Sequence, residues 1–414
     1  MNYIVWAIPV FFLFMVIEII AAKIEGKKVY RLNDSINDLS CGVLEQVILA
    51  FVKTFLFGIY VLIFEFFVAK NWHIFNIEPS LLSWTILFIL VDFLYYWAHR
   101  FSHTTAIGWA GHAVHHQSEE FNLSVALRQG TLQPFFTFIF YLPLAAFGFL
   151  PAMFLIAKSA NTLYQFWIHT RLINTMGPLE WFMNTPSHHR VHHGKNEQYI
   201  DKNYAGIFII WDRLFGSFEK EDIHPAYGVL TPLKSWNPVW ANLSYFLHLG
   251  KLSIRSPFFI DKVKVWFMPP GWGPRKMPEE NAPDPSTLYD KYDPKIPLNI
   301  SIYATLQFAM TTIGTLYLLS QMKNMHYEKY AIATLIIVSL INIGGIFDKK
   351  TWAVYTEVLR LYSIAIFTTV HYYNSPMFFP IVFTVFIVAT LFSLWIQYKW
   401  PTKRSDNAFS KEKT

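Results

Sequence analysis

The sequence predicts an all-α, multi-pass integral membrane protein with a histidine-cluster di-metal domain at the cytoplasmic face. Of its 414 residues, 53% are hydrophobic and only 15% are charged, whereas soluble domains average about 25% charged residues. Several apolar runs reach the ~20 residues that a membrane-spanning helix needs. Ten of the 15 histidines fall between residues 99 and 193. A membrane scaffold and a metal site are therefore expected in one chain.

The N-terminal region, residues 1–98, is expected to hold three transmembrane helices. Apolar runs cover residues 3–22, 42–68 and 81–98. The first run lacks a basic start and a small-residue cleavage site, so we interpret it as a retained helix and not as a signal peptide.

The next region, residues 99–222, contains the histidines and one broken apolar segment. Residues 132–157 are interrupted by Pro143 and Pro151. Together with residues 159–169 they predict a re-entrant hairpin, over 132–169, that enters and leaves the membrane on one side.

The C-terminal half begins with a connector and ends in four further spans. Residues 223–298 hold 12 of the 22 prolines, which favours a cytoplasmic connector with little regular secondary structure. The expected C-terminal transmembrane helices, within residues 299–398, are 299–320, 329–347, 353–373 and 376–398. The third carries Glu357 and Arg360, which are unusual in a span. Residues 399–414 form a polar tail.

The distribution of charged residues predicts the orientation of the chain in the membrane and argues against nucleic acid as a partner. The loop 23–41 and the C-terminal tail are rich in lysine and arginine, and positive loops usually face the cytoplasm. This rule places the histidine region and the C-terminus on the cytoplasmic side. The net charge is +6, without a basic run interleaved with aromatics, so nucleic acid is not an expected partner. A single cysteine, Cys41, excludes an internal disulfide.

Three histidine clusters have the spacing of metal ligands. Histidines three or four residues apart share one face of a helix, and adjacent histidines are rotated by ~100°, so a cluster of the form HxxHH can reach two ions. The clustered histidines are His99, His103, His112, His115, His116, His189, His192 and His193. His169 is a candidate ninth ligand. The remaining isolated histidines are interpreted as ordinary surface or hydrogen-bonded residues.

The type and number of candidate ligands limit which metal ions could bind here, but they do not identify a single metal. Imidazole suits zinc, copper, iron and nickel, and no cysteine belongs to the clusters. Structural zinc usually closes with four ligands, so eight or nine histidines favour a pair of ions. A redox pair beside lipid would most naturally activate oxygen, although spacing alone does not separate iron from zinc.

Neighbouring polar groups should orient these ligands, because a ligating imidazole donates its other N–H to a carboxylate or carbonyl. Candidate carboxylates are Asp92, Glu119, Glu120, Asp201 and Asp212. His188 lies next to the last cluster, and Arg128 could contact a carboxylate or a lipid head group.

The three clusters, HRFSH, HAVHH and HRVHH, resemble the histidine boxes of the integral-membrane fatty acid hydroxylase and sterol desaturase superfamily. The resemblance implies a membrane-embedded monooxygenase with two iron ions held by the eight clustered histidines. His169 stands where this superfamily often has a further ligand. Gln165 stands where some fatty acid hydroxylases carry a histidine.

Longer segments, among them WAGHAVHHQSEEFNLSVALRQ and NTPSHHRVHHG, are similar to the members of this superfamily that cleave glyceryl ethers. That similarity implies a lipid substrate from the bilayer, O2, and tetrahydrobiopterin as the electron donor. It also implies hydroxylation of the carbon next to the ether oxygen. One departure is Thr104, where those members carry a glutamate; it bears on the pterin and the ether lipid more than on the metals.

Two alternatives are kept. The first is a sterol or fatty acyl hydroxylase or desaturase of the same superfamily. The second is a non-redox, zinc-binding membrane protein. A transporter would normally place its polar ligands near the middle of the bilayer, whereas most of these clusters lie beyond the spans.

Overall fold

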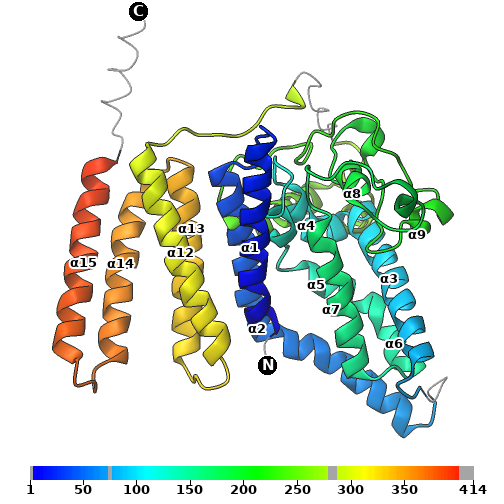
Figure 1. The fold of residues 1–414 in the computed structure, drawn as a ribbon, viewed down its shortest axis with the longest axis horizontal. Coiled ribbons are helices and arrows are strands. Elements are labelled where there is room, and N and C mark those ends of the chain that lie inside the picture. The colour runs from blue at the N-terminus through cyan, green and yellow to red at the C-terminus, as the bar shows by residue number, and fades with distance from the viewer. Residues whose placement is uncertain (1–2, 73–76, 278–286, 401–414) are drawn as a thin grey trace, which may run out of the picture. The chain divides into compact units, whose positions relative to one another are not determined.

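The computed structural model describes residues 3–72, 77–277 and 287–400, and these residues form helices, loops and two isolated β-bridges (Figure 1). The α-helices are α1 (Tyr3–Ile24), α2 (Leu32–Ala69), α3 (Leu81–Thr104), α4 (Ala106–His116), α5 (Gln133–Thr137), α6 (Leu142–Phe147), α7 (Pro151–Trp167), α8 (Pro186–His192), α9 (Ile210–Leu214), α10 (Pro238–Arg255), α11 (Phe259–Phe267), α12 (Leu298–Gln321), α13 (Glu328–Phe347), α14 (Trp352–His371) and α15 (Phe378–Lys399). Short 3-10 helices are η1 (Val125–Leu127), η2 (Phe138–Tyr141), η3 (Gly177–Trp181) and η4 (Glu197–Tyr199).

Six of the described helices are long and apolar enough to cross a membrane, which confirms the prediction of an all-α, multi-pass membrane protein. They are α2, α3, α12, α13, α14 and α15. The expected span 3–22 coincides with α1, which is not among these six, and its crossing of the membrane stays a prediction.

Helices α2 and α3 are longer than their predicted spans, and the excess reaches the histidine region. At about 1.5 Å per residue, the 38 residues of α2 extend about 57 Å, against a hydrocarbon core of about 30 Å. Helix α3 begins at the Ser80–Ser83 capping box and continues to Thr104. Its last turns therefore carry His99 and His103.

The segment 132–169 descends through α5, η2 and α6, turns, and returns through α7. Pro143 and Pro151 lie at the starts of α6 and α7. The backbone N–H that proline lacks would have no partner within the helix at these positions, so proline is tolerated there. Gly148, with φ +101°, makes the turn. Tyr60, Leu87 and Phe154 are buried in the core that joins this segment to α2 and α3. Its entry into a membrane stays a prediction.

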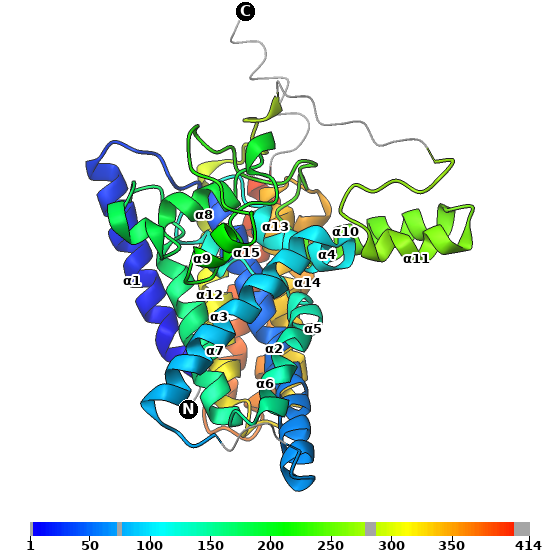
Figure 2. The same ribbon diagram turned by 90° about the vertical axis from the view of Figure 1, so that its right-hand side faces the viewer.

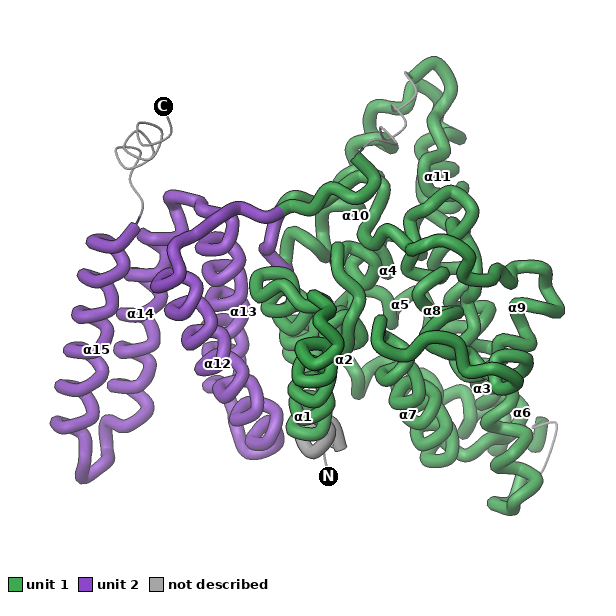
Figure 3. Tube along the Cα trace, turned by 45° about the horizontal axis from the view of Figure 1, so that its top comes forward, with its two compact units in different colours: residues 1–234, 239–292 green, residues 235–238, 293–414 purple. Residues whose placement is uncertain are grey.

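The chain divides into two compact units (Figure 3). Residues 1–234 and 239–292 form one unit, and residues 235–238 and 293–414 form the other. The expectation of little regular structure over 223–298 is wrong, because α10 and α11 lie there.

Three of the prolines in this segment lie at helix boundaries, where they do not interrupt a helix. Pro238 begins α10, and Pro257 and Pro269 follow the ends of α10 and α11. Helices α10 and α11 pack beside α4 through Ala106, Leu249 and their neighbours (Figure 2).

A charged pair is buried inside the C-terminal unit. Arg360 of α14 donates to Glu357 at 2.6 Å, to Gln307 of α12 at 2.7 Å and to Ser339 of α13 at 3.2 Å. Glu357 also accepts from Asn342 of α13. A span with two ionisable residues is therefore compatible with a membrane, since neighbouring helices satisfy both charges.

Replacing Glu357 with glutamine should destabilise this unit. Breaking a buried ion pair from one side costs about 3–5 kcal/mol, because the remaining charge is uncompensated. The thermal unfolding midpoint in detergent should fall for Glu357→Gln and recover in part for Glu357→Gln with Arg360→Met. Glu328→Gln, at the exposed start of α13, is the control. A Glu357→Gln midpoint equal to that of the unmodified protein would contradict this account.

Candidate metal centre

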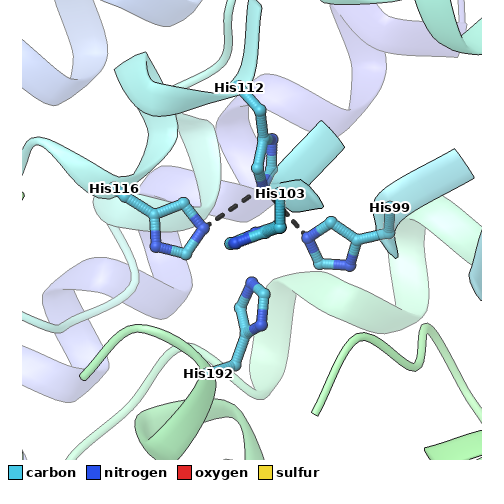
Figure 4. A group of neighbouring side chains, drawn as sticks. All are labelled: His99, His103, His112, His116 and His192. Carbon is cyan, nitrogen blue, oxygen red and sulfur yellow. Dashed lines mark hydrogen bonds between the residues drawn. The ribbon is translucent and has the colours of Figure 1, made fainter. Parts of the chain in front are cut away.

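All nine histidines singled out in the sequence lie together, in two buried groups. The first group, shown in Figure 4, is His99, His103, His112, His116 and His192. The second group is His115, His169, His189 and His193. Within each group, one ring nitrogen per residue lies within 4.8 Å of the others.

The HxxHH clusters divide between the two groups as their helical rotation predicts. On α4, His112 and His116 face the first group while His115 faces the second. At α8, His189 and His193 face the second group while His192 faces the first. Each of these two short segments therefore contributes to both groups and fixes their separation.

Four of the imidazoles are oriented by backbone carbonyl groups, to which they donate Nδ1–H. The pairs are His99 with Tyr204 at 2.7 Å, His115 with Arg128 at 2.8 Å, His169 with Gln165 at 2.7 Å and His192 with Lys202 at 3.0 Å. A proton on Nδ1 leaves Nε2 of a neutral imidazole with a bare lone pair. These four rings are therefore held in the tautomer that coordinates a metal through Nε2.

The Nε2 atoms of His115 and His169 face each other at 3.3 Å. Both rings carry their proton on Nδ1, so no hydrogen lies between these two atoms. Two opposed lone pairs at this distance repel unless a cation lies near both. The residues present therefore fit a metal ion, and the all-nitrogen donor set is one that iron, zinc, copper or nickel accepts.

Burial keeps the imidazoles neutral. It lowers the pKa of His115 to about 4 and the pKa of His192 to about 3, and it lowers the pKa values of His112, His169 and His193 well below the ordinary value. Neutral imidazole is the form that binds metal. Nine nitrogens can therefore converge near pH 7 without accumulating positive charge.

Asp92 and Asp212 act through the backbone and not through direct contact with a histidine. Asp212 accepts from the amides of Tyr204 and Ala205 at 2.8 Å each. Asp92 accepts from the amide of Ile207 at 2.7 Å. Both carboxylates therefore hold the loop whose Tyr204 carbonyl orients His99.

The other predicted neighbours have different positions. Gln165 orients His169 through its backbone carbonyl, and its side chain accepts from Tyr95 at 2.6 Å. Oδ1 of Asp201 lies 3.9 Å from Nδ1 of His103, beyond hydrogen-bond distance. The ring of His188 belongs to neither group and packs against Phe218.

The remaining acidic candidates lie in ion pairs away from the histidines. Glu119 pairs with Arg31 at 3.0 Å, and Glu120 pairs with Arg171 at 2.8 Å. The hydroxyl of Thr104 donates to the carbonyl of Arg100.

Arg128 is a supporting residue whose role the sequence left open. Its buried guanidinium lies 3.3 Å from Asp38 of α2, and it also donates to Asn37. These contacts fix the loop whose Arg128 carbonyl orients His115. The partner is a carboxylate distant in sequence, which a single arginine in the motif ALRQ does not reveal.

Acidification should destabilise the metal-free protein. Unfolded histidine titrates near pH 6.5, whereas burial holds the pKa of His115 at about 4 and of His192 at about 3. Between these values the unfolded chain binds more protons, so the stability that is fully present above about pH 6.5 is lost as the pH falls towards 4. Thermal midpoints of chelator-treated protein should fall across this window, and less steeply for His115→Gln. Midpoints independent of pH would contradict this expectation.

Comparison with known proteins places the chain in a family. The fatty acid hydroxylase family model matches residues 84–217, a range that includes both histidine groups. Alkylglycerol monooxygenase of Homo sapiens is 38% identical over 370 residues, covering 87% of this chain and 81% of the relative. The enzymes of that name from Xenopus tropicalis and Caenorhabditis elegans are 37% and 33% identical, covering 87% and 84% of this chain and 80% and 72% of the relatives. No solved structure matches. The chain belongs to the alkylglycerol monooxygenase family.

Proposed function

We propose that this protein is an oxygen-dependent, di-iron membrane monooxygenase that cleaves the O-alkyl bond of glyceryl ether lipids. The observation that carries the proposal is the pair of buried all-histidine groups at the end of an apolar helix, with the bare Nε2 atoms of His115 and His169 opposed at 3.3 Å. The alkylglycerol monooxygenases that cover most of the chain support the ether lipid as substrate.

The first histidine group would hold one iron and the second group would hold the other. Bound there, the iron pair supplies the oxidising power that an unactivated C–H bond requires and that side chains lack. One oxygen atom of O2 enters the C–H bond next to the ether oxygen. The other leaves as water, with two electrons and two protons from a donor, for which we propose tetrahydrobiopterin. The hemiacetal formed collapses to a fatty aldehyde and glycerol or a lysolipid.

The protein contributes binding, orientation and exclusion of water. Helix α3 runs from an apolar span into its histidines, so a lipid can approach the metals without leaving an apolar surface. Carbonyl groups fix four rings before a metal binds, which limits the reorganisation needed on binding. Burial of all nine side chains keeps bulk water from the reacting centre.

We further propose which side of the membrane the histidine groups face and what role each region of the chain has. The histidine groups and the C-terminus would face the cytoplasm, because lysine and arginine are concentrated in the loop 23–41 and in the tail. Residues 99–222 would form the catalytic region. The helices of 299–398 would anchor it in the bilayer.

The iron content of purified variants distinguishes histidines that bind metal from histidines that only lie nearby. Purified protein should hold about two irons per chain, and His189→Ala should lower this value because it removes a member of the second group. His188→Ala is the matched control, since its ring belongs to neither group, and should retain both irons. Zinc in place of iron, or equal metal loss in both variants, would overturn the di-iron proposal.

Product analysis tests the reaction. Membranes containing the protein, supplied with a labelled glyceryl ether, O2 and tetrahydrobiopterin, should release a fatty aldehyde. His192→Ala should abolish the release while membrane insertion is unchanged. Labelled sterols and acyl lipids in parallel assays test the other activities of the superfamily. Aldehyde release that His192→Ala retains would contradict the proposal.

A further inference from the structure

Helices α10 and α11 form a hairpin that is apolar on two opposite sides. One side packs against α4 through Leu249 and Val265. The other side carries six large apolar side chains with exposed fractions between 47% and 81%, which we call the outer apolar face: Leu247, Ile254, Phe259, Ile260, Val263 and Phe267. An exposed apolar patch of this kind marks a site that contacts another protein or a membrane.

The outer apolar face follows from helical spacing. On α11, Phe259, Val263 and Phe267 recur every four residues and therefore line one side of the helix. Val265 is two residues from Val263, which places it about 200° around the helix, towards the core. Helix α10 has the same arrangement, since Leu247 is exposed and Leu249, two residues later, is buried. The core takes up one apolar side of each helix and leaves the other exposed.

The hairpin is also strongly basic. Residues 238–277 hold six lysine and arginine residues and one acidic residue, so their net charge is 6 − 1 = +5, against +6 for the whole chain. Lys262 and Lys264 are each rotated by about 100° from Val263 and so flank the outer apolar face. An apolar stripe bordered by lysine is typical of helices that lie in a membrane interface, whereas lysine is depleted from contacts between proteins.

The hairpin joins the protein close to the point where the apolar part of α3 ends. The amide of Ala106, the first residue of α4, donates to the carbonyl of Met268 at the end of α11 at 2.9 Å. Thr104, the last residue of α3, lies six residues beyond Ala98, where the expected span ends. Six residues of helix extend about 9 Å, and the polar head-group region on each side of a bilayer is about 5–7 Å thick. The attachment of α11 is therefore at the depth of the head groups or just outside them.

The direction of the hairpin agrees with this depth. Helices α10 and α11 extend sideways at the level of α4, across the direction of α2 (Figure 2). A helix that runs across the spanning direction can lie in the plane of the interface, with its apolar side in the bilayer and its lysines among the head groups.

We propose that the outer apolar face of the α10–α11 hairpin lies in the head-group region of the bilayer, with its lysine and arginine side chains against the phosphates of anionic lipids. The leaflet is the one on the side of the histidine groups, because α11 is hydrogen-bonded to α4, which carries His112, His115 and His116. This contact goes beyond the proposed function and does not depend on it. It would hold α4 at the membrane surface whatever reaction the metals support.

Fluorescence quenching by lipid tests the contact on the full-length protein. Val263→Cys is labelled with a fluorophore; Cys41 is fully buried and should not react. In vesicles of phosphatidylcholine and phosphatidylglycerol, bromine on the acyl chains should remove most of the fluorescence. Lys220→Cys, at an exposed position in the polar segment 219–222, is the control and should keep its fluorescence. An unquenched label at Val263→Cys, or equal quenching at both positions, would overturn the proposal.

Bromine on one lipid at a time tests the preference for anionic lipid. At fixed vesicle composition, the label at Val263→Cys should be quenched more by brominated phosphatidylglycerol than by brominated phosphatidylcholine. Adding Lys264→Glu should lower this preference at least about fivefold, the factor that one lysine contributes near an anionic surface. Lys220→Glu is the matched control and should leave the preference unchanged. Equal quenching by the two lipids before any charge is changed would contradict the anionic contact.

A second copy of this chain is the competing occupant of the outer apolar face. If two copies met there, Val263→Cys without a label should form disulfide-linked dimers on mild oxidation, and its fluorophore should escape quenching. That pair of results would assign the face to a protein contact and overturn the proposal, whereas quenching without dimers supports it. None of these measurements uses iron or aldehyde release, so failure of the di-iron reaction would leave their outcome unaffected.

Discussion

The structure depends on imidazoles whose bare nitrogens are forced to face one another. Backbone carbonyls hold the protons of His115 and His169 on Nδ1, so their Nε2 lone pairs meet at 3.3 Å. Such an arrangement is unfavourable by itself and becomes favourable when a cation occupies the space between the rings. The surrounding loops therefore hold in place an arrangement that a bound metal ion would stabilise, and a site held in this way would need little reorganisation on binding.

Burial and helix geometry make this arrangement possible in one chain. Burial keeps the rings neutral, and the helical rotation within HxxHH sends neighbouring histidines to different groups. Helix α3 joins the apolar spans to the first group. These features would hold two bound ions close together at the end of an apolar helix, as the proposed lipid monooxygenase requires.

Hydropathy and histidine spacing were sufficient to predict much of this structure. Apolar length predicted the helices that can cross a membrane, and the HxxHH pattern predicted which histidines meet. The carbonyls of Tyr204, Arg128 and Lys202 could not be predicted, because every residue carries a carbonyl and its direction depends on the folded loop. Asp92 was expected to contact a ligand directly. Instead, its carboxylate accepts a hydrogen bond from the backbone amide of Ile207, which is 115 positions away in the sequence. Only the tertiary structure reveals this contact. The helices α10 and α11 were missed because prolines at helix boundaries resemble prolines that prevent helices.

X-ray absorption at the iron edge of the purified protein tests the central claim most directly, because it reports the atoms bound to the metal. The account predicts two neighbouring irons whose protein ligands are imidazole nitrogens alone, with the multiple-scattering pattern of several rings and weaker imidazole scattering in His115→Gln. Isolated iron without a second metal nearby, or a coordination shell dominated by sulfur or carboxylate oxygen, would contradict it.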